Sequence, residues 1–254
     1  MNHLPIQRPV LLKSKILSAY PELRHAISTR RGGTGESPFG FNLSYDVGDD
    51  APTVALNRKL VCEEIQIPEE RIAFQRQIHS DTVSIVTQPG IYENCDGLIT
   101  NIPELYLAVT VADCVPVLLY DPIKQCVAAI HSGWKGTQQN IVPKAFRKMA
   151  VTFGSTPSDI LCFIGPGAGE CCYDVGEGVS GLFPSEYMIS REGKLYPNLK
   201  RMIYDSVRTE GVALVSIEVS PLCSICEATL LQSYRRDGIK SGRMMGIIGF
   251  RERE

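Results

Sequence analysis

Three short apolar runs follow one another in the middle of the chain, and they constrain the fold more than any other feature. The runs span Leu105 to Val111, Val115 to Tyr120 and Gln125 to Ile130, and they are rich in Val, Ile and Leu. Runs of this length and composition are typical of buried strands. A Rossmann order does not follow, because too many strands are adjacent and no G-x-G-x-x-G opens a helix.

Helices and further strands are interspersed along the rest of the chain. Asp50 is an N-cap candidate for a helix that stops before Pro68, and a second helix is expected over 136–153, irregular at its start because Pro143 lacks a backbone donor. Further helices are expected at 178–183 and 195–210, and further strands at 23–29, 72–78, 82–87, 98–100, 160–164, 212–219 and 244–250. The predicted fold class is α/β (α+β), with mixed β-sheets flanked by helices in a single domain over 1–254.

Composition limits the classes of partner. The net charge of −2 over 254 residues gives no basic footprint for nucleic acid, and no apolar run approaches the length of about 20 residues that spans a bilayer. The segment Met1 to Pro9 lacks the apolar core of a secretion signal. Nine scattered cysteines, an odd number, favour a reduced, cytoplasmic setting. The oligomeric state, monomer or small homo-oligomer, stays open.

Rare, reactive side chains stand at the ends of strand-like runs. Cys114 ends Ala112-Asp113-Cys114, His131 opens a segment that holds the only tryptophan, and His79 ends Gln75-Arg76-Gln77-Ile78-His79. Two imidazoles and one thiolate suit a zinc ion with one coordination position left open, which is typical of catalytic zinc. The competing interpretation is a core thiol with two hydrogen-bonded histidines. His25, within a strand, and His3, near the terminus, are not expected to be ligands.

The other cysteines are expected to be structural. Cys223-Ser224-Ile225-Cys226 is a C-x-x-C pair that alone indicates redox chemistry or half of a zinc site. No second C-x-x-C and no nearby histidine completes it. Cys171 and Cys172 cannot both face a pocket, and Cys172 is the one taken as a substrate-binding candidate, against a structural role. Four cysteines in or next to apolar runs are expected in the core: Cys62, Cys95, Cys126 and Cys162.

Motifs along nearly the whole chain resemble the YfiH/laccase-domain family. They are Thr29-Arg30-Arg31-Gly32-Gly33, Gln77-Ile78-His79-Ser80, Asp96-Gly97-Leu98-Ile99-Thr100, Ala112-Asp113-Cys114-Val115-Pro116-Val117, Ala129-Ile130-His131-Ser132-Gly133-Trp134-Lys135-Gly136, Gly165-Pro166, Cys171-Cys172-Tyr173-Asp174-Val175 and Ser233-Tyr234-Arg235-Arg236-Asp237. This family, formerly labelled multicopper polyphenol oxidoreductase, is associated with zinc-dependent purine nucleoside phosphorolysis and adenosine deamination. The resemblance implies that His79, Cys114 and His131 hold the metal. Ser132 and Lys135 stand where the family often has Ala and Arg.

The resemblance implies purine nucleosides and phosphate as substrates. Arg30, in its Gly-rich loop, and Lys135, beside the tryptophan, are candidates for binding phosphate. The alternative for Arg30 is a solvated turn. Asn42 is a candidate for hydrogen bonding ribose or a base edge, or else a turn residue. Asp113 is a candidate general base, or a group that orients a histidine ligand, with a strand-cap role as the alternative.

Three rival functions remain at this point. The catalytic candidates are Asp113, Cys114 and His79. They either surround a metal that activates water for attack on C6 of adenine, or Cys114 itself acts as a nucleophile. The resemblance also implies a hydrolase that edits misincorporated amino acids in peptidoglycan precursors, which could use the same metal-activated water or Cys114 as a nucleophile. A copper-dependent polyphenol oxidase needs many histidines and the chain has four, although Cu²⁺ could displace zinc. A purely structural zinc needs four ligands, and this pattern offers three.

Overall fold

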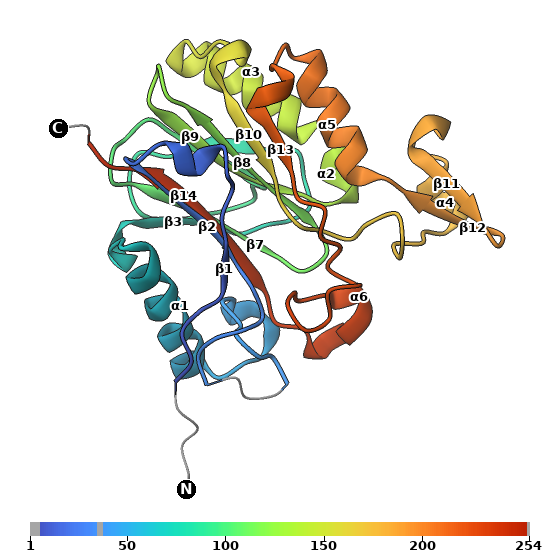
Figure 1. The fold of residues 1–254 in the computed structure, drawn as a ribbon, viewed down its shortest axis with the longest axis horizontal. Coiled ribbons are helices and arrows are strands. Elements are labelled where there is room, and N and C mark those ends of the chain that lie inside the picture. The colour runs from blue at the N-terminus through green and yellow to red at the C-terminus, as the bar shows by residue number, and fades with distance from the viewer. Residues whose placement is uncertain (1–5, 35–37, 253–254) are drawn as a thin grey trace, which may run out of the picture.

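Two β-sheets stacked face to face form the centre of the molecule, and helices cover both outer faces (Figure 1). The computed structural model describes residues 6–34 and 38–252. His3 and most of the segment discussed for secretion therefore lie outside the described residues. The expected fold class, mixed sheets flanked by helices, is confirmed.

The first sheet joins strands from both ends of the chain. In spatial order it contains β1 (Leu11–Leu12), β2 (Leu23–Ser28), β14 (Met244–Phe250), β7 (Tyr106–Val111), β3 (Ile72–Gln75) and β5 (Gly90–Tyr92). β14 runs antiparallel to β2 and β7, whereas β3 runs parallel to β7 and β5. The parallel pairing places the carboxyl ends of β3 and β7 at the same edge, which is where the candidate site lies.

The second sheet is built around two strands that are buried along their whole length. Its order is β13 (Ile217–Val219), β10 (Leu161–Ile164), β8 (Val115–Asp121), β9 (Cys126–Ser132), β6 (Gly97–Thr100) and β4 (Val83–Ile85). β8 and β9 form an antiparallel hairpin, in which Pro116 stands opposite His131. A separate two-stranded ribbon, β11 (Met188–Arg191) with β12 (Lys194–Pro197), extends from the side of the molecule (Figure 1).

Helices pack on the outer faces and short helical turns connect the strands. The α-helices are α1 (Ala51–Ile65), α2 (Trp134–Gln138), α3 (Ile141–Phe153), α4 (Glu177–Ser180), α5 (Leu199–Thr209) and α6 (Tyr234–Asp237). The 3-10 helices are Leu17–Ala19, Tyr45–Val47, Glu69–Arg71, Pro157–Asp159, Ser185–Tyr187, Leu214–Ser216 and Gly238–Lys240. None of the helices in the described ranges is long and apolar enough to span a membrane.

Alternation along the strands divides the apolar side chains among three cores. In β9, Val127 and Ala129 face the other sheet, while Ala128 and Ile130 face the helices. The core between the sheets therefore meets one face of each strand, and α3 with α5 covers the opposite face of the second sheet. α1 covers the outer face of the first sheet through Val61 and its neighbours. This two-residue period explains why strands buried on both faces appear as continuous apolar runs.

Several predicted elements differ at their ends. The helix expected over 136–153 is two helices, α2 and α3, separated at Asn140, whose φ is 60°. Pro143 then lies in the first turn of α3, where a missing N–H costs little. The helix expected over 195–210 begins only at Leu199, because residues 194–197 pair as β12. In the strand expected over 212–219, only Ile217–Val219 is extended within the sheet.

Candidate active site

Three side chains with metal-binding atoms meet where the strands of the two sheets end. His79 follows β3, Cys114 lies between β7 and β8, and His131 lies near the end of β9. Their ligand atoms all lie within 4.8 Å of one another. The two imidazole rings meet edge to face, with centroids 4.9 Å apart and an angle of 80° between their planes. The structure thus assembles the three residues expected from the sequence.

Asp96, immediately before β6, holds both histidines in place. Its Oδ1 accepts a hydrogen bond from Nδ1 of His131 at 2.8 Å and from the backbone N–H of His79 at 3.0 Å. Its Oδ2 accepts from the N–H and the hydroxyl of Ser80, both at 2.7 Å. Burial would raise the pKa of this carboxyl, but the hydrogen bonds from His131 and Ser80 outweigh it and lower the pKa to about 2. Because Asp96 occupies Nδ1, the Nε2 of His131 is left for a metal ion.

Cys114 and His131 stabilise each other's charged forms in the metal-free protein. Desolvation raises the pKa of the Cys114 thiol, but the charge and hydrogen bond of His131 outweigh it, so the pKa lies below its ordinary value. Desolvation likewise lowers the pKa of His131, and Cys114 with Asp96 outweighs it and raises the pKa. The thiolate is the form of cysteine that binds metals.

Gly133 leaves the room that this cluster needs. A Cβ atom added there would lie 2.9 Å from Cys114 Sγ and 3.3 Å from His79 Cδ2. The φ of Gly133 is −74°, so any residue could adopt its backbone conformation. Glycine is therefore required here by the space between ligands and not by the backbone.

The cluster faces a cavity with a volume of about 830 Å³. Its lining includes three guanidinium groups, those of Arg76, Arg235 and Arg243, and the aromatic side chains of Trp134, Tyr173 and Tyr234. Arg235 lies over the ring of Tyr173, 5.0 Å from its centroid. The remaining lining residues are Ser44, Asp46, Val47, Gln75, Gln77, His79, Thr110, Ala112, Asp113, Cys114 and His131.

Asp113 also lines this cavity, but it does not orient a histidine. Its φ is 86°, which turns the chain between β7 and β8. Its Oδ1 accepts from the hydroxyl of Ser224 and its Oδ2 from the backbone N–H of Arg235, both at 2.6 Å. The histidine-orienting role expected for Asp113 belongs to Asp96. Asp113 instead connects the turn that carries Cys114 to the segment that carries Arg235.

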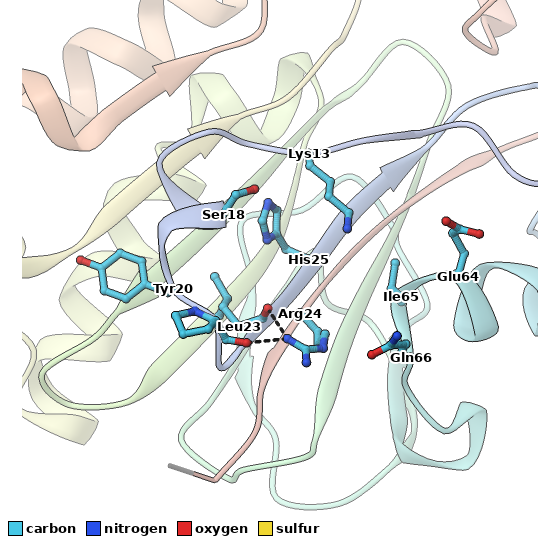
Figure 2. Close-up of a pocket in the computed structure, with 10 residues that line it drawn as sticks. Lys13, Ser18, Tyr20, Leu23, Arg24, His25, Glu64, Ile65 and Gln66 are labelled. Atoms are coloured by element: carbon cyan, nitrogen blue, oxygen red, sulfur yellow. Dashed lines mark hydrogen bonds between the residues drawn. The ribbon is translucent and has the colours of Figure 1, made fainter. Parts of the chain in front are cut away.

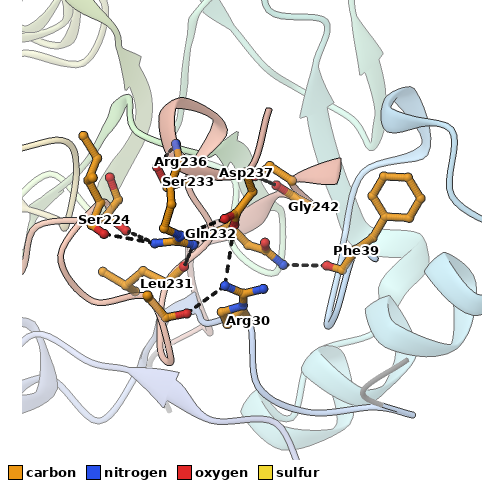
Figure 3. A network of polar contacts seen from close by, with 12 residues as sticks. Arg30, Phe39, Ser224, Leu231, Gln232, Ser233, Arg236, Asp237 and Gly242 are labelled. Atoms are coloured by element: carbon orange, nitrogen blue, oxygen red, sulfur yellow. Dashed lines mark hydrogen bonds and ion pairs between the residues drawn. The ribbon is translucent and has the colours of Figure 1, made fainter. Parts of the chain in front are cut away.

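Arg30 and Lys135, the candidates for binding phosphate, lie outside the lining of the cavity. Arg30 donates to the carbonyl of Ala228 at 2.7 Å and pairs with Asp237 at 3.5 Å (Figure 3). Its guanidinium is thus engaged in holding the loop before α6. Lys135 is exposed, with Nζ 5.6 Å from the ring centroid of Trp134.

Asn42 and Cys172 also lie outside the lining of the cavity. Asn42 is buried, its amide donates to Ser44 and its Oδ1 accepts from the N–H of Arg243 at 2.8 Å. It therefore shapes the cavity wall from behind and does not line the cavity. Cys172 belongs to a second group of four cysteines, with Cys171, Cys223 and Cys226. The fold thus completes the C-x-x-C pair, which the sequence interpretation had left without partners.

Another cavity lies apart from this site and shares none of its lining residues (Figure 2). His25 lines it, and burial lowers the pKa of this histidine to about 4. Its Nε2 accepts from the backbone N–H of Ser14 at 3.0 Å. As expected from the sequence, His25 is not placed with the metal-ligand group.

Sequence reasoning assigned no role to Asp96, Tyr173 or Arg243. The first two lie within motifs that carried the family resemblance, so those motifs were the available signal. Arg243 follows Ser241-Gly242 at the start of the last strand, and no spacing marks it as a cavity residue. Arg235 lies in another of those motifs, Ser233-Tyr234-Arg235-Arg236-Asp237, and it lines the cavity.

The donor set and its surroundings fit a zinc ion. Two imidazoles and one thiolate are ligands that zinc favours, and three protein ligands leave a fourth position for water or substrate. The carboxylate of Asp96 supports a histidine ligand through its other ring nitrogen, as in many zinc sites. Fold and site together define a protein with two stacked mixed sheets and an open His₂Cys centre at their shared edge.

Comparison with known proteins identifies the family. The chain belongs to the family described as multi-copper polyphenol oxidoreductase laccase, whose model matches residues 24–251. It is 33% identical to purine nucleoside phosphorylase YlmD of Bacillus subtilis over 91% of this chain and 90% of that one. It is 36% identical to a purine nucleoside phosphorylase of Deinococcus radiodurans, over 91% and 90% respectively. The crystal structure of YlmD from Geobacillus stearothermophilus superposes with a TM-score of 0.87 at 31% identity, covering 94% of both chains.

Proposed function

We propose that this chain is a zinc-dependent purine nucleoside phosphorylase that acts at the His79, Cys114 and His131 centre. One arrangement supports this function above others: the open three-ligand centre shares its cavity with three arginines and with aromatic rings. Arginines suit phosphate, and aromatic rings suit a purine base. The relatives named purine nucleoside phosphorylase give independent support.

His79, Cys114 and His131 would hold the zinc ion through one atom each. When bound there, zinc supplies a Lewis acid with one open coordination position. Asp96 keeps the Nε2 of His131 directed to the centre, and Gly133 keeps the space beside Cys114 open. These two residues position the ligands and do not touch the substrate.

Arg235 and Arg243 take the phosphate-binding role in this proposal. Both line the cavity. The backbone N–H of Arg235 donates to Asp113 and that of Arg243 donates to Asn42, and these hydrogen bonds fix both residues in the cavity wall. A guanidinium group offers two parallel donors to phosphate oxygens, which a lysine cannot match. Tyr173 and Trp134 provide apolar faces against which a purine can lie.

The reaction transfers the ribosyl group from nitrogen to phosphate. A phosphate oxygen attacks C1′ of the nucleoside while the bond from C1′ to N9 of the purine breaks. The bonding electron pair stays on N9, which takes up a proton, and the products are free base and ribose 1-phosphate. Asp113, which lines the cavity, would accept the proton of the attacking phosphate as a general base.

Adenosine deamination is a second activity proposed for the same cavity. Its support is the open coordination position, since a metal with a free site activates water for attack on C6 of adenine. The reaction consumes adenosine and water and releases inosine and ammonia. Adenosine, inosine, guanosine and methylthioadenosine are the substrates to compare.

The rival functions make different demands on the same cavity. A multicopper oxidase needs clusters of histidines, and among the described residues only His79 and His131 join a candidate metal group. Copper would therefore act by displacing zinc. A hydrolase that edits peptidoglycan precursors would need water and no phosphate.

The nine cysteines are free thiols, which supports the proposed cytoplasmic setting. A monomer and a small homo-oligomer would both contain the complete cavity.

A phosphate-dependence assay separates these functions. Zinc-loaded protein is incubated with inosine, with and without inorganic phosphate, and hypoxanthine and ribose 1-phosphate are quantified. We expect both products only with phosphate. Arg243→Lys should raise KM for phosphate by about 10-fold, the loss of one charge-assisted hydrogen bond. Lys135→Ala should leave KM unchanged, because Lys135 lies outside the cavity lining. Equal base release without phosphate would contradict phosphorolysis, and ammonia release from adenosine tests deamination separately.

A further inference from the structure

A second group of metal-binding side chains lies outside the His79, Cys114 and His131 centre. Cys171 and Cys172 follow β10, and Cys223 and Cys226 follow β13, which pairs with β10 in parallel. The four sulfur atoms all lie within 4.8 Å of one another. Cys226 Sγ is 3.1 Å from Cys172 Sγ and 3.4 Å from Cys171 Sγ.

We propose that Cys171, Cys172, Cys223 and Cys226 bind a Zn²⁺ ion as a closed, structural site, distinct from the open centre. Four thiolates in a tetrahedron form a common structural zinc site, with Zn–S bonds of about 2.3 Å. Such bonds place the sulfurs roughly 3.8 Å apart. The four sulfurs therefore reach a tetrahedron through side-chain rotation, with the two loops kept in place.

Backbone donors around Cys223 prepare its sulfur for the thiolate state. The N–H of Gly169 donates to Cys223 Sγ at 3.3 Å, and the N–H groups of Ile225 and Cys226 also donate to it. A C-x-x-C turn that offers its own N–H groups to the first sulfur stabilises negative charge there. Gly169 is itself packed against the group, because an added Cβ would lie 3.2 Å from Cys171 Sγ.

Two cationic side chains lie beside the group. The Nζ of Lys200 donates to the carbonyls of Ser220 and Leu222, and its charge interacts with those of Cys223 and Cys171. The guanidinium of Arg191 donates to the carbonyl of Cys171 at 2.7 Å. Zinc with four thiolates carries a net charge of about −2, and these cations offset it.

The two segments that carry the cysteines are already joined by the fold. Gly167 and Cys223 form a parallel β-bridge, and the N–H of Ser224 donates to the carbonyl of Gly167 at 3.0 Å. Arg236 donates to the carbonyls of Ser224 and Ile225 at 2.8 and 3.2 Å (Figure 3). These hydrogen bonds fix the backbone of the C-x-x-C turn beside Cys171 and Cys172 without any bound ion.

The proposed zinc would fix one wall of the substrate cavity. Tyr173, next to Cys172, lines that cavity, and Ser224, next to Cys223, donates to Asp113 at 2.6 Å. A metal between the two loops would thus hold both the aromatic face and the carboxylate in register. The consequence goes beyond the proposed reaction, since this site would stabilise the fold whichever substrate is used.

Zinc counting tests the site without measuring turnover. Protein prepared with added zinc and dialysed should contain about two ions per chain, one per site. The double variant Cys171→Ser with Cys226→Ser, at two exposed positions, should contain about one. The double variant Cys114→Ser with His131→Ala should also contain about one, and Cys126→Ala, which removes a cysteine outside both groups, should keep about two.

X-ray absorption at the zinc edge identifies the ligands. In the variant with Cys114→Ser and His131→Ala, the remaining zinc should show four sulfur neighbours at about 2.3 Å. Zinc content unaffected by Cys171→Ser with Cys226→Ser would overturn the proposal, as would nitrogen or oxygen ligands in that spectrum. Intact mass showing a disulfide among the four cysteines in protein purified under reducing conditions would overturn it too. Loss of nucleoside turnover alone changes none of these readings, so the two proposals fail independently.

Discussion

Replacing Asp96 by asparagine should weaken zinc binding although Asp96 is not a ligand. The change keeps the shape of the side chain but leaves one acceptor oxygen in place of two. The Oδ2 position accepts from three donors, in Ile78 and Ser80, and the Oδ1 position from two, in His79 and His131. The asparagine oxygen should therefore take the Oδ2 position, where it accepts the larger number of hydrogen bonds. The new NH₂ group then faces the N–H groups of His79 and His131.

This clash has a predictable size. His131 can relieve it by moving its proton to Nε2, but a protonated Nε2 cannot bind zinc. A hydrogen bond to a charged group is worth about 1.5–3 kcal/mol. Since about 1.4 kcal/mol changes an equilibrium constant tenfold, zinc affinity should fall by roughly 10–100-fold. That range matches the usual effect of removing a carboxylate behind a histidine ligand.

Competition with a fluorescent zinc chelator measures this affinity. Asp121→Asn is the matched control, because Asp121 is equally buried but receives its hydrogen bonds from Ile123 and Lys124, in a turn far along the hairpin. The control should bind zinc as the wild type does at the His79 and His131 centre. Unchanged zinc affinity in Asp96→Asn, in a protein that remains folded by circular dichroism, would refute the reasoning.

Three further predictions follow from the same geometry. Gly133→Ala should lower zinc affinity by about tenfold or more, because the added Cβ would lie 2.9 Å from Cys114 Sγ and overpacking costs about 1–3 kcal/mol. Gly176→Ala, which has open space around it, should leave zinc affinity unchanged, and chelator competition compares the two variants. In zinc-free protein, iodoacetamide should alkylate Cys114 at a pH below the ordinary thiol range, because its lowered pKa keeps the thiolate present as the pH falls. Added zinc should protect Cys114 from alkylation, and peptide mass mapping identifies the modified residue. Reaction only at alkaline pH would count against the thiolate. Arg30→Ala should reduce the free energy of unfolding by about 1 kcal/mol, because its contacts to the loop before α6 are lost. The KM for phosphate should stay unchanged, and a raised KM would show that Arg30 contributes to phosphate binding.

Local patterns predicted the framework well where one element determines its own structure. The apolar runs of the central strands and the Asp50 cap of α1 are signals contained within a few residues. The strand before α5 was missed because it depends on a partner elsewhere in the chain. Residues 194–197 are extended only because residues 188–191 pair with them.

The site shows the same division. Motifs supplied the three ligands of the open centre, but their neighbours come from long-range pairing. Asp96 reaches His131 across the pairing of β6 with β9. Cys171 and Cys226 are 55 positions apart and meet because β10 and β13 are adjacent parallel strands. No spacing rule within the sequence shows that a lone C-x-x-C pair has two further thiols beside it.

Phosphate-dependent nucleoside cleavage by the zinc-loaded protein tests the central claim most directly. Wild-type protein, supplied with inosine and phosphate, should release hypoxanthine and ribose 1-phosphate in equal amounts. The variant Cys114→Ser should have lost this activity, while Cys126→Ala should retain it. Turnover by Cys114→Ser at the wild-type rate, or cleavage that yields free ribose in place of ribose 1-phosphate, would contradict the account.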